Sequence, residues 1–354
     1  MKNFWEKLPK PFFCLAPMAD VTDAAFRRVI TKYGKPDILW TEFVSADGLV
    51  SKGREILKSD LIFDKKEKPI IAQLFSSDYD KMRQASAYVA SLGFDGIDIN
   101  MGCPDRSIEK QGSGAAMIKD TEKAKKIIQA VKDGVKDAKK NISISVKTRI
   151  GYNKNQIKEW IPFLLSCDID ALTVHARTRK EMSKVPARWE HIKEVVEIRD
   201  KMGVKTKIIG NGDVLDLAHG FKLAKETGCD GIMIGRGIFG NPWLFSSLRS
   251  GRISKSTNIS LLGNFSARAS RSAQGFPQYA PSLQEKLKVL IEHTKTYEKI
   301  LGKVKNFAIM KKHYKAYLNG FPGSKELRIK LMETNNVKEV EKNIKDFIKN
   351  NNLL

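Results

Sequence analysis

Short runs of apolar and β-branched residues, each bounded by turn-forming residues, recur eight times in the first two thirds of the chain. These runs cover residues 13–16, 38–41, 70–75, 96–100, 142–147, 171–175, 207–210 and 231–235. Stretches with the period of amphipathic helices lie between them, at residues 79–92, 121–138, 155–165 and 215–228. This alternation is typical of βα units around a parallel sheet. Because no GxGxxG motif follows the first run, the pattern predicts an α/β fold of the (β/α)8 TIM barrel type rather than an open dinucleotide-binding sheet.

The pattern changes at residue 249 to a stretch rich in Ser, Arg, Gly and Asn with weak periodicity. Helical periods return at residues 282–299, 304–318, 324–333 and 337–349, with Gly320, Pro322 and Gly323 as breaks. We therefore expect a catalytic barrel over residues 1–248, a linker or inserted loop over residues 249–281, and a small all-helical C-terminal domain over residues 282–354.

The charge of the chain is strongly positive and unevenly distributed. The 63 Lys and Arg residues against 40 Asp and Glu give a formal net charge of +23. From Arg249 onward there are 21 basic and 8 acidic residues, so +13 of this excess lies in roughly the last third. Such a field attracts polyanions and favours a nucleic-acid partner. An AT-rich genome, whose codons encode many lysines, would give the same charge balance.

The four cysteines lie far apart, without the CxxC spacing of zinc sites. They predict neither a metal centre nor a disulfide framework. No apolar run approaches the ~20 residues that cross a bilayer, and the first ten residues lack the apolar stretch of a secretory signal. We expect a reduced, cytoplasmic protein with no metal and no membrane association, and the sequence identifies no protein partner.

Small and polar residues stand at nearly every predicted strand end, which is where TIM barrels place their chemistry. In chain order they are Ala16, Pro17 and Met18, then Gln73, Asn100, Lys147, His175, Asn211, and Gly235 with Arg236. Any one of them is explained as a capped strand end, but buried polar groups need partners. Together they predict a binding site for a flat ligand rich in heteroatoms.

The last two strand ends have the composition of a phosphate site. Asn211, Gly212 and Asp213 follow the seventh run, and Gly235 and Arg236 follow the eighth. Glycines alone are as common in ordinary turns. Their paired position, with backbone N–H groups and a cation, matches the place where such barrels bind phosphate.

A flavin is the simplest ligand that fits the remaining strand ends. Lys147 and His175 are expected to donate hydrogen bonds to the side of an isoalloxazine ring where negative charge accumulates on reduction. A core histidine is the alternative for His175 alone. Gln73 and Asn100, whose amides both donate and accept, would face the pyrimidine edge of the ring.

Cys103 lies in a loop between Gly102 and Pro104, just after the fourth run, so its thiol is expected to point into the barrel mouth. A thiol with an ordinary pKa of about 8.5 is mostly protonated at neutral pH. A general acid that protonates carbon therefore fits Cys103 better than a nucleophile. Cys14, Cys167 and Cys229 do not lie in a loop at the barrel mouth, and we interpret them as structural residues.

Seven segments together resemble the tRNA-dihydrouridine synthases. They are PFFCLAPMADVTD (11–23), NMGCP (100–104), VKTR (146–149), VHARTR (174–179), GNGD (210–213), IGRG (234–237) and MKKHYKAYLNGFPGSKELR (310–328). Each is weak alone, but the ordered set spans most of the chain and is specific.

The resemblance implies an FMN-dependent oxidoreductase that converts uridine to 5,6-dihydrouridine in tRNA. In that family a hydride passes from flavin N5 to uracil C6, the cysteine matching Cys103 protonates C5, and NADPH reduces the flavin again. By position, the resemblance assigns to the flavin Ala16, Pro17, Met18, Gln73, Lys147, His175, Asn211, Gly212, Asp213, Gly235 and Arg236. It assigns Asn100 and Arg177 to the substrate.

The target base lies within a folded RNA, so it has to leave its stack before it reacts. The resemblance makes the C-terminal helical domain the tRNA-binding module. Four lysines are expected to contact the RNA from one helix whose apolar side holds Phe307, Met310 and Tyr314: Lys305, Lys311, Lys312 and Lys315. A solvated charged face is the alternative for each of them.

Residues 254–281 depart from the family pattern, because this segment is longer and richer in Ser and Arg than a short connection. It carries Arg268 and Arg271 and no acidic residue, which suits an RNA-contacting loop, a disordered insert or an error in the gene model. Two rival functions also stay open: a flavin barrel acting on a free pyrimidine, and an RNA-binding protein on an inactive barrel.

Overall fold

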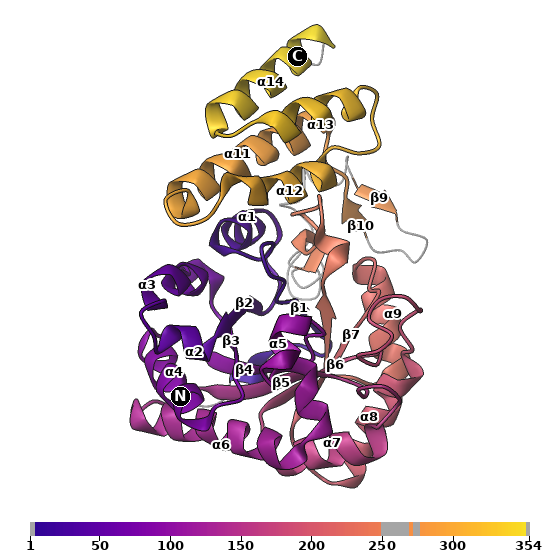
Figure 1. Ribbon diagram of the computed structural model, residues 1–354. Helices are drawn as coiled ribbons and strands as arrows, with labels where there is room; N and C mark the ends of the chain where they lie inside the picture. Colours follow the sequence, from indigo (N-terminus) through magenta and orange to yellow (C-terminus); the bar gives the residue numbers. More distant parts are fainter. Residues whose placement is uncertain (1–3, 249–268, 272–276, 352–354) are drawn as a thin grey trace. The chain divides into compact units, whose positions relative to one another are not determined.

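The computed structural model describes residues 4–248, 269–271 and 277–351 (Figure 1). Eight parallel strands form one sheet in the order β1-β8-β7-β6-β5-β4-β3-β2, and a bridge between Cys14 and Ile38 joins its first strand to the chain entering the second. The strands are β1 (Phe12–Leu15), β2 (Leu39–Ser45), β3 (Ile70–Phe75), β4 (Gly96–Met101), β5 (Ser143–Arg149), β6 (Ala171–His175), β7 (Lys207–Asn211) and β8 (Gly231–Ile234). The predicted TIM barrel is confirmed.

Helices alternate with the strands along the chain (Figure 1). They are α1 (Ala24–Gly34), α2 (Ala46–Leu49), α3 (Arg54–Leu57), α4 (Tyr79–Ser91), α5 (Arg106–Lys110), α6 (Thr121–Asp137), α7 (Ile157–Ser166), α8 (Glu190–Lys201) and α9 (Leu217–Thr227). Short 3-10 helices add η1 (Phe4–Lys7), η2 (Lys58–Leu61), η3 (Lys65–Glu67), η4 (Gly114–Lys119) and η5 (Arg236–Ile238). The four helices expected from periodicity correspond to α4, α6, α7 and α9.

Aspartates fix the amino ends of the barrel strands. In four places an Asp just before a strand accepts a hydrogen bond from the backbone N–H of the first or second residue of the neighbouring strand, at 2.8–2.9 Å. The pairs are Asp37 with Phe13, Asp95 with Ile70, Asp170 with Ile144, and Asp230 with Ile208. These bonds satisfy donors that would otherwise be left at the sheet margin, so this end of the barrel serves stability.

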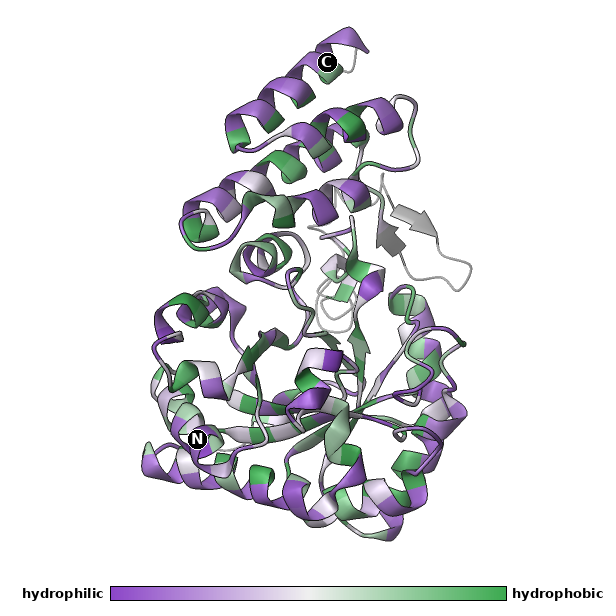
Figure 2. Cartoon of the chain, viewed as in Figure 1, coloured by the Kyte–Doolittle hydropathy of each residue, from purple (hydrophilic) through white to green (hydrophobic). Residues whose placement is uncertain are grey.

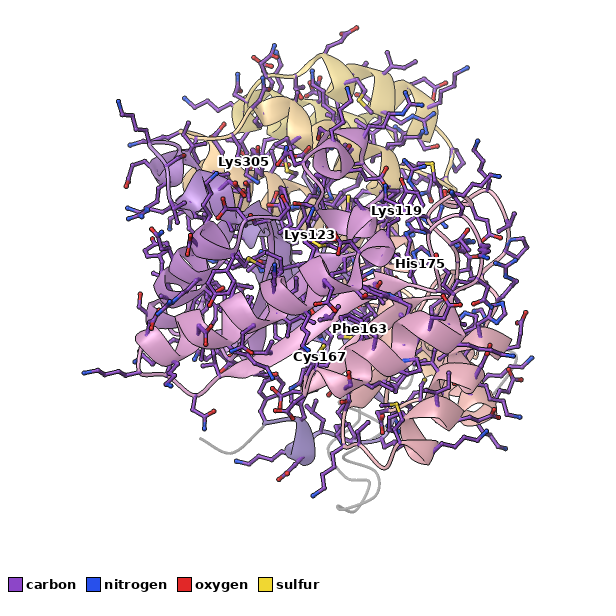
Figure 3. All side chains as sticks on the ribbon, turned by 60° about the horizontal axis from the view of Figure 1, so that its bottom comes forward. Lys119, Lys123, Phe163, Cys167, His175 and Lys305 are labelled. Atoms are coloured by element: carbon purple, nitrogen blue, oxygen red, sulfur yellow. The ribbon has the colours of Figure 1, made fainter. Side chains whose placement is uncertain are left out.

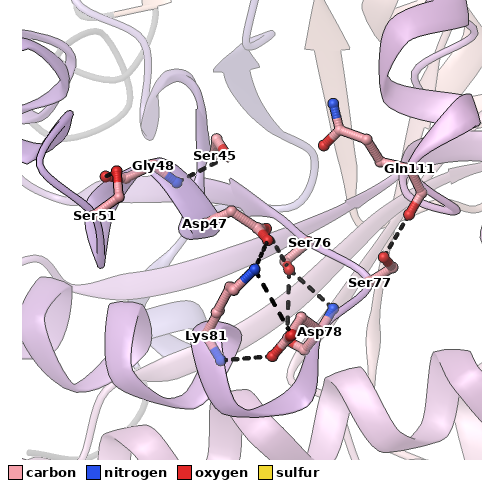
Figure 4. Close-up of polar contacts among 9 residues, drawn as sticks. All are labelled: Ser45, Asp47, Gly48, Ser51, Ser76, Ser77, Asp78, Lys81 and Gln111. Atoms are coloured by element: carbon pink, nitrogen blue, oxygen red, sulfur yellow. Dashed lines mark hydrogen bonds and ion pairs between the residues drawn. The ribbon is translucent and has the colours of Figure 1, made fainter.

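Polar contacts also tie the loops at the opposite, carboxyl ends of the strands (Figure 4). Ser76, just after β3, donates to the carboxylate of Asp47, just after β2, at 2.6 Å. Lys81 of α4 lies 2.9 Å from the other Asp47 oxygen. Ser77 donates to the carbonyl of Gln111, beyond α5. Loops that follow three consecutive strands are thereby held to one another.

The C-terminal region contains α11 (Leu283–Leu301), η7 (Phe307–Ile309), α12 (Met310–Tyr317), α13 (Ser324–Glu333) and α14 (Val337–Asn350), besides the strand pair β9 (Ala269–Arg271) and β10 (Pro277–Tyr279). Hydrophilic and hydrophobic residues alternate along α14 (Figure 2). The single helix expected over residues 304–318 is wrong in detail. Asn306 is extended and its side chain caps a new 3-10 turn by accepting from the Ala308 N–H, so α12 begins only at Met310.

The chain forms two compact units, each of which combines segments from separate parts of the sequence. One contains Met1–Met18, Asp37–Leu215 and His219–Gly235, and the other contains Ala19–Pro36, Asp216–Ala218 and Arg236–Leu354. Helix α1 belongs to the second unit, where Ala25 and Val29 share a buried core with Leu287, Leu290 and Tyr314. The assignment of catalysis to residues 1–248 and of tRNA binding to residues 282–354 stays a prediction. Most of the segment 249–281, including Arg268, lies outside the described residues.

Candidate active site

Strand pairing in the first unit aligns polar residues in three rows across neighbouring strands. The inner row is Gln73, Asp98 and Ser145, the middle row is Asn100, Lys147 and Thr173, and the outer row is Arg149, His175 and Asn211. Residues two apart on a strand face the same side, so each strand contributes successive rows to one face of the sheet. Most of the polar strand ends that the sequence singles out are therefore brought together.

A continuous chain of hydrogen bonds runs from the inner row to the loop after β4. Gln73 Nε2 donates to Asp98 Oδ2 at 2.6 Å, and Asn100 Nδ2 donates to Gln73 Oε1 at 3.1 Å. Asn100 Oδ1 in turn accepts from the backbone N–H groups of Gly102, at 3.1 Å, and Cys103, at 2.9 Å. The backbone of Cys103 is thus anchored to buried side chains of the barrel.

The thiol of Cys103 is only partly buried, unlike those of Cys14 and Cys229. Burial raises its pKa, and the nearby charges of Arg149 and Lys147 only partly oppose that effect. The thiol therefore carries its proton at neutral pH, as a proton donor must. Gly114 packs against this loop at a φ of +61°, where an added Cβ would lie 2.8 Å from the Cys103 carbonyl oxygen.

Lys147 projects from β5 as a half-buried cation. Its Nζ donates to Asn211 Oδ1 at 3.3 Å, and Asn211 Nδ2 donates to the Met233 carbonyl oxygen at 2.9 Å. Burial lowers the pKa of Lys147 to about 8, with a further reduction from Arg149 and an opposing effect from Asp98. The ammonium still predominates at neutral pH, and only one of its three N–H groups is directed to Asn211.

His175 and Arg177 form one unit at the end of β6. Arg177 Nη1 lies 3.1 Å from His175 Nε2, and Arg177 Nη2 is paired with the Asp213 carboxylate. Because a guanidinium has no acceptor, His175 Nε2 is the acceptor in this contact and the ring proton lies on Nδ1. His175 is then a neutral donor through Nδ1. Arg177 is almost fully buried, and its Nε donates to the Val185 carbonyl.

A family model described as dihydrouridine synthase matches residues 14–352 of this chain. A probable tRNA-dihydrouridine synthase of Staphylococcus aureus (strain COL) is 35% identical over 348 residues, covering 98% of this chain and 96% of its own. The chain belongs to the dihydrouridine synthase family. Probable tRNA-dihydrouridine synthase 2 of Bacillus subtilis (strain 168) is 37% identical over 348 residues, covering 98% and 97%. The resemblance inferred from the seven segments, and with it the expectation of an enzyme, is confirmed.

A solved structure of 2-naphthoyl-CoA reductase in complex with 2-naphthoyl-CoA is similar in fold, with a TM-score of 0.51 and 13% sequence identity. The similarity covers 68% of this chain and 50% of that one. At this identity the likeness concerns the fold alone.

The expected phosphate-binding residues of this dihydrouridine synthase lie at the ends of β7 and β8. Gly212, with a φ of +129°, approaches His175 so closely that an added Cβ would lie 3.2 Å from the ring. A Cβ on Gly235 would lie 3.6 Å from both Ala16 Cβ and Met18 Sδ, which places the β1 and β8 ends side by side. Pro17, between Ala16 and Met18, is half-buried. Arg236, which opens η5, is exposed and belongs to the second unit.

The four lysines predicted to bind RNA lie in the second unit. Lys312 and Lys315 are exposed, Lys311 is half-buried, and Lys312 pairs with Asp20 at 3.0 Å. Lys305 precedes η7 and is not on the same helix as the others. The apolar side of α12 includes Met310 and Tyr314, both fully buried. Their contact with RNA stays a prediction.

Sequence reasoning missed three residues of the family member's site. Asp98 and Arg149 are buried charges in the inner and outer rows, and Trp189 Nε1 donates to the Gly212 carbonyl at 2.9 Å. Period-2 alternation was the available signal for the first two, since each lies two residues from a predicted site residue on the same strand. Nothing local marks Trp189, which lies 23 residues before Gly212 in the chain.

Cys167 caps the end of α7, ahead of β6, whereas His175 ends that strand; both are labelled in Figure 3. Cys14, Cys167 and Cys229 are free thiols, as is Cys103. Within the described ranges, no group of three or more His, Cys, Asp or Glu residues is arranged to hold a metal ion. No described helix is both long and apolar enough to cross a membrane.

Proposed function

We propose that this chain is an FMN-dependent tRNA-dihydrouridine synthase that reduces uridine to 5,6-dihydrouridine in tRNA, with NADPH as the reductant. The observation that carries the proposal is the placement of Cys103. Its backbone is tied to Asn100 at 2.9 Å. In this family member the half-buried Lys147 lies in the same row as Asn100, and the half-buried His175 lies in the outer row of the same sheet face.

The side chains of the first unit suit a flavin. Lys147 and His175 are half-buried donors, as a ring that gains negative charge on reduction requires. We also assign Gln73 to the flavin ring, and Pro17, Met18 and Gly235 provide small or apolar surface. Asn211, Gly212 and Asp213 would meet the chain and phosphate of FMN. When bound, FMN supplies the hydride.

The protein residues divide the remaining tasks. Asn100, through its second N–H, approaches the uracil, and Cys103 Sγ gives its proton to C5 of the base as C6 is reduced. The raised pKa of Cys103 keeps that proton available at neutral pH. Arg177, whose nitrogens bond within the protein, acts by fixing His175, and any contact that it makes with the substrate comes second.

The lysines of the second unit, Lys305, Lys311, Lys312 and Lys315, would bind the phosphates of tRNA around the displaced base. Binding of this kind weakens steeply with salt because counterions are released on association. We therefore expect the affinity for tRNA to fall by orders of magnitude between 50 and 200 mM salt, as it does for proteins with roughly 6–10 phosphate contacts.

The test uses purified protein, NADPH and tRNA isolated from cells that lack this gene. Formation of dihydrouridine, measured by mass spectrometry of digested tRNA, supports the proposal. Free uridine, uracil and orotate are assayed in parallel. Reduction of a free pyrimidine but not of tRNA would indicate a small-molecule flavoenzyme instead. A colourless protein without bound flavin would contradict the proposed FMN cofactor.

A further inference from the structure

Asp98 is a fully buried carboxylate that has no place in the chemistry described so far. It accepts from Gln73 Nε2 at 2.6 Å through one oxygen and from Ser145 Oγ at 2.5 Å through the other. Burial raises its pKa to about 6, opposed by these hydrogen bonds and by the charge of Lys147. At neutral pH the group is therefore a carboxylate, which only accepts hydrogen bonds.

Because the Asp98 carboxylate can only accept hydrogen bonds, it determines the orientation of the Gln73 amide. A carboxylate must face the NH2 group of Gln73, so the carbonyl oxygen of the amide points away from it, toward Asn100. Asn100 must then present its own NH2 group to Gln73, at 3.1 Å. Its Oδ1 is left facing the N–H groups of Gly102 and Cys103. One buried charge thus fixes the orientation of two amides and of the loop that they hold.

The opposite orientation is excluded by the same chemistry. A reversed Gln73 would direct its Oε1 at the Asp98 carboxylate and its Nε2 at the Asn100 NH2 group, so two acceptors and then two donors would face each other. Each contact would leave a buried polar group unsatisfied, which is more costly than the loss of a solvated hydrogen bond. Without Asp98, only the N–H groups of Gly102 and Cys103, which act through Asn100, favour this orientation of Gln73.

We propose that Asp98 is a positioning residue, which orients the Gln73 and Asn100 amides and through them holds Cys103 in place. The inference rests on the proposed role of Cys103 and deepens it. The same orientation directs the second N–H of Gln73 away from Asp98.

Two substitutions at Asp98 separate charge from orientation. Asp98→Asn can keep an oxygen toward Gln73 Nε2 and offer its own NH2 to Ser145 Oγ, because a hydroxyl also accepts. The orientation of both amides is then preserved without the charge. Asp98→Val removes the acceptor with a side chain that suits a strand. Ser145→Ala is the matched control, since it breaks the other hydrogen bond of Asp98 and leaves the one to Gln73.

The readout is the rate at which iodoacetamide alkylates Cys103 as a function of pH, measured by mass spectrometry of its peptide. Cys167→Ser is included in every variant because Cys167 is the other partly exposed thiol of the chain. Loss of the Asn100 anchor should loosen the loop and speed alkylation in D98V by roughly fivefold or more, while D98N and S145A should stay within about twofold of the parent. Reduction of tRNA should fall about tenfold in D98V and be largely kept in D98N.

Alkylation of D98V at the parent rate, or an equal acceleration in S145A, would overturn the inference. If D98V does not fold, Asp98→Ala is compared with D98N by the same two readouts, and equal rates in that pair would overturn it as well. Cys103→Ala is assayed on tRNA alongside. An unimpaired C103A would remove the proposed proton-donor role of Cys103, whereas the alkylation result depends neither on tRNA nor on flavin and tests Asp98 by itself.

Discussion

Arg149 holds Gly102: its Nε donates to the Gly102 carbonyl oxygen at 2.7 Å, one residue before Cys103. Its Nη1 also lies 3.2 Å from the carbonyl oxygens of Thr178 and Met182, in the loop after β6. The loop that carries the thiol and the loop that follows His175 are therefore tied to one guanidinium. Arg149 is 7% exposed, and burial lowers its pKa to about 10, so it stays charged at neutral pH.

Arg149→Lys should impair catalysis although it keeps the charge. One ammonium cannot reproduce the planar guanidinium that reaches three carbonyl groups. Each buried hydrogen bond from a charged group that is lost costs about 1.5–3 kcal/mol, so we expect a lower midpoint of thermal unfolding and at least a tenfold fall in kcat. Arg83→Lys is the control, because Arg83 pairs with Asp137 on the surface. Equal effects of the two substitutions on kcat would contradict the role given to Arg149.

Lys147 should make the affinity for FMN depend on pH. Its pKa is lowered to about 8 by burial, and lysine is charged below its pKa, so the cation is present at pH 7 and lost as pH rises through about 8. Affinity of the flavin-free protein should fall roughly tenfold between pH 7 and pH 9, as expected for one charge-assisted hydrogen bond. Quenching of flavin fluorescence measures it.

Lys147→Met should bind FMN more weakly at pH 7 and show no change across the same range. Lys193→Met, which removes an exposed lysine from α8, should retain the wild-type profile. A wild-type profile in K147M would mean that another group titrates and that Lys147 does not face the flavin.

Two buried histidines should make the second unit sensitive to acid. The ring centroids of His293 and His313 are 4.5 Å apart, and Phe26 packs on both rings. Burial lowers the pKa of His313 to about 3 and that of His293 well below its usual value. His293 has no hydrogen-bond partner for either ring nitrogen among the described residues.

The sign of the effect follows from where the protons bind. Below pH 6.5 the two histidines are protonated in the unfolded chain but stay neutral in the folded chain. The free energy of unfolding therefore decreases as the pH is lowered, by up to ~1.4 kcal/mol per pH unit for each histidine. Urea unfolding at pH 7.5, 6.5 and 5.5 measures this slope. His313→Leu should flatten it, and His191→Gln, at a partly exposed histidine, should not. An equally steep slope in H313L would exclude the histidine pair as its origin.

Much of the fold was predictable from local pattern. The apolar run at residues 70–75, one of eight that alternate with helical stretches, predicts a strand of a parallel sheet, and β3 has those same bounds. The helix α13 was also predicted to the residue because Gly323, at a φ of +77°, starts it and Thr334 ends it in extended backbone. Such signals are local, and the sequence contains them in full.

The remainder depends on contacts between distant residues. β5 continues to Arg149, beyond the predicted end at Lys147, because pairing with His175 extends the strand. The hydrophobic face of α1 packs with Leu287 and Tyr314 in the second unit, although its place after β1 makes it look like a barrel helix. The roles of Asp98 and Trp189 likewise follow from register and tertiary packing, which periodicity does not encode.

The proposed chemistry depends on Cys103 as the proton donor, and a single turnover tests this role most directly. The flavin of wild type, Cys103→Ala and Cys167→Ala is reduced with NADPH, and the rate of its reoxidation by unmodified tRNA is then followed. We predict that C103A is reduced normally but reduces tRNA at least ~10²-fold more slowly, as loss of a positioned acid implies, and that C167A matches wild type. Reoxidation of C103A by tRNA at the wild-type rate would contradict this role.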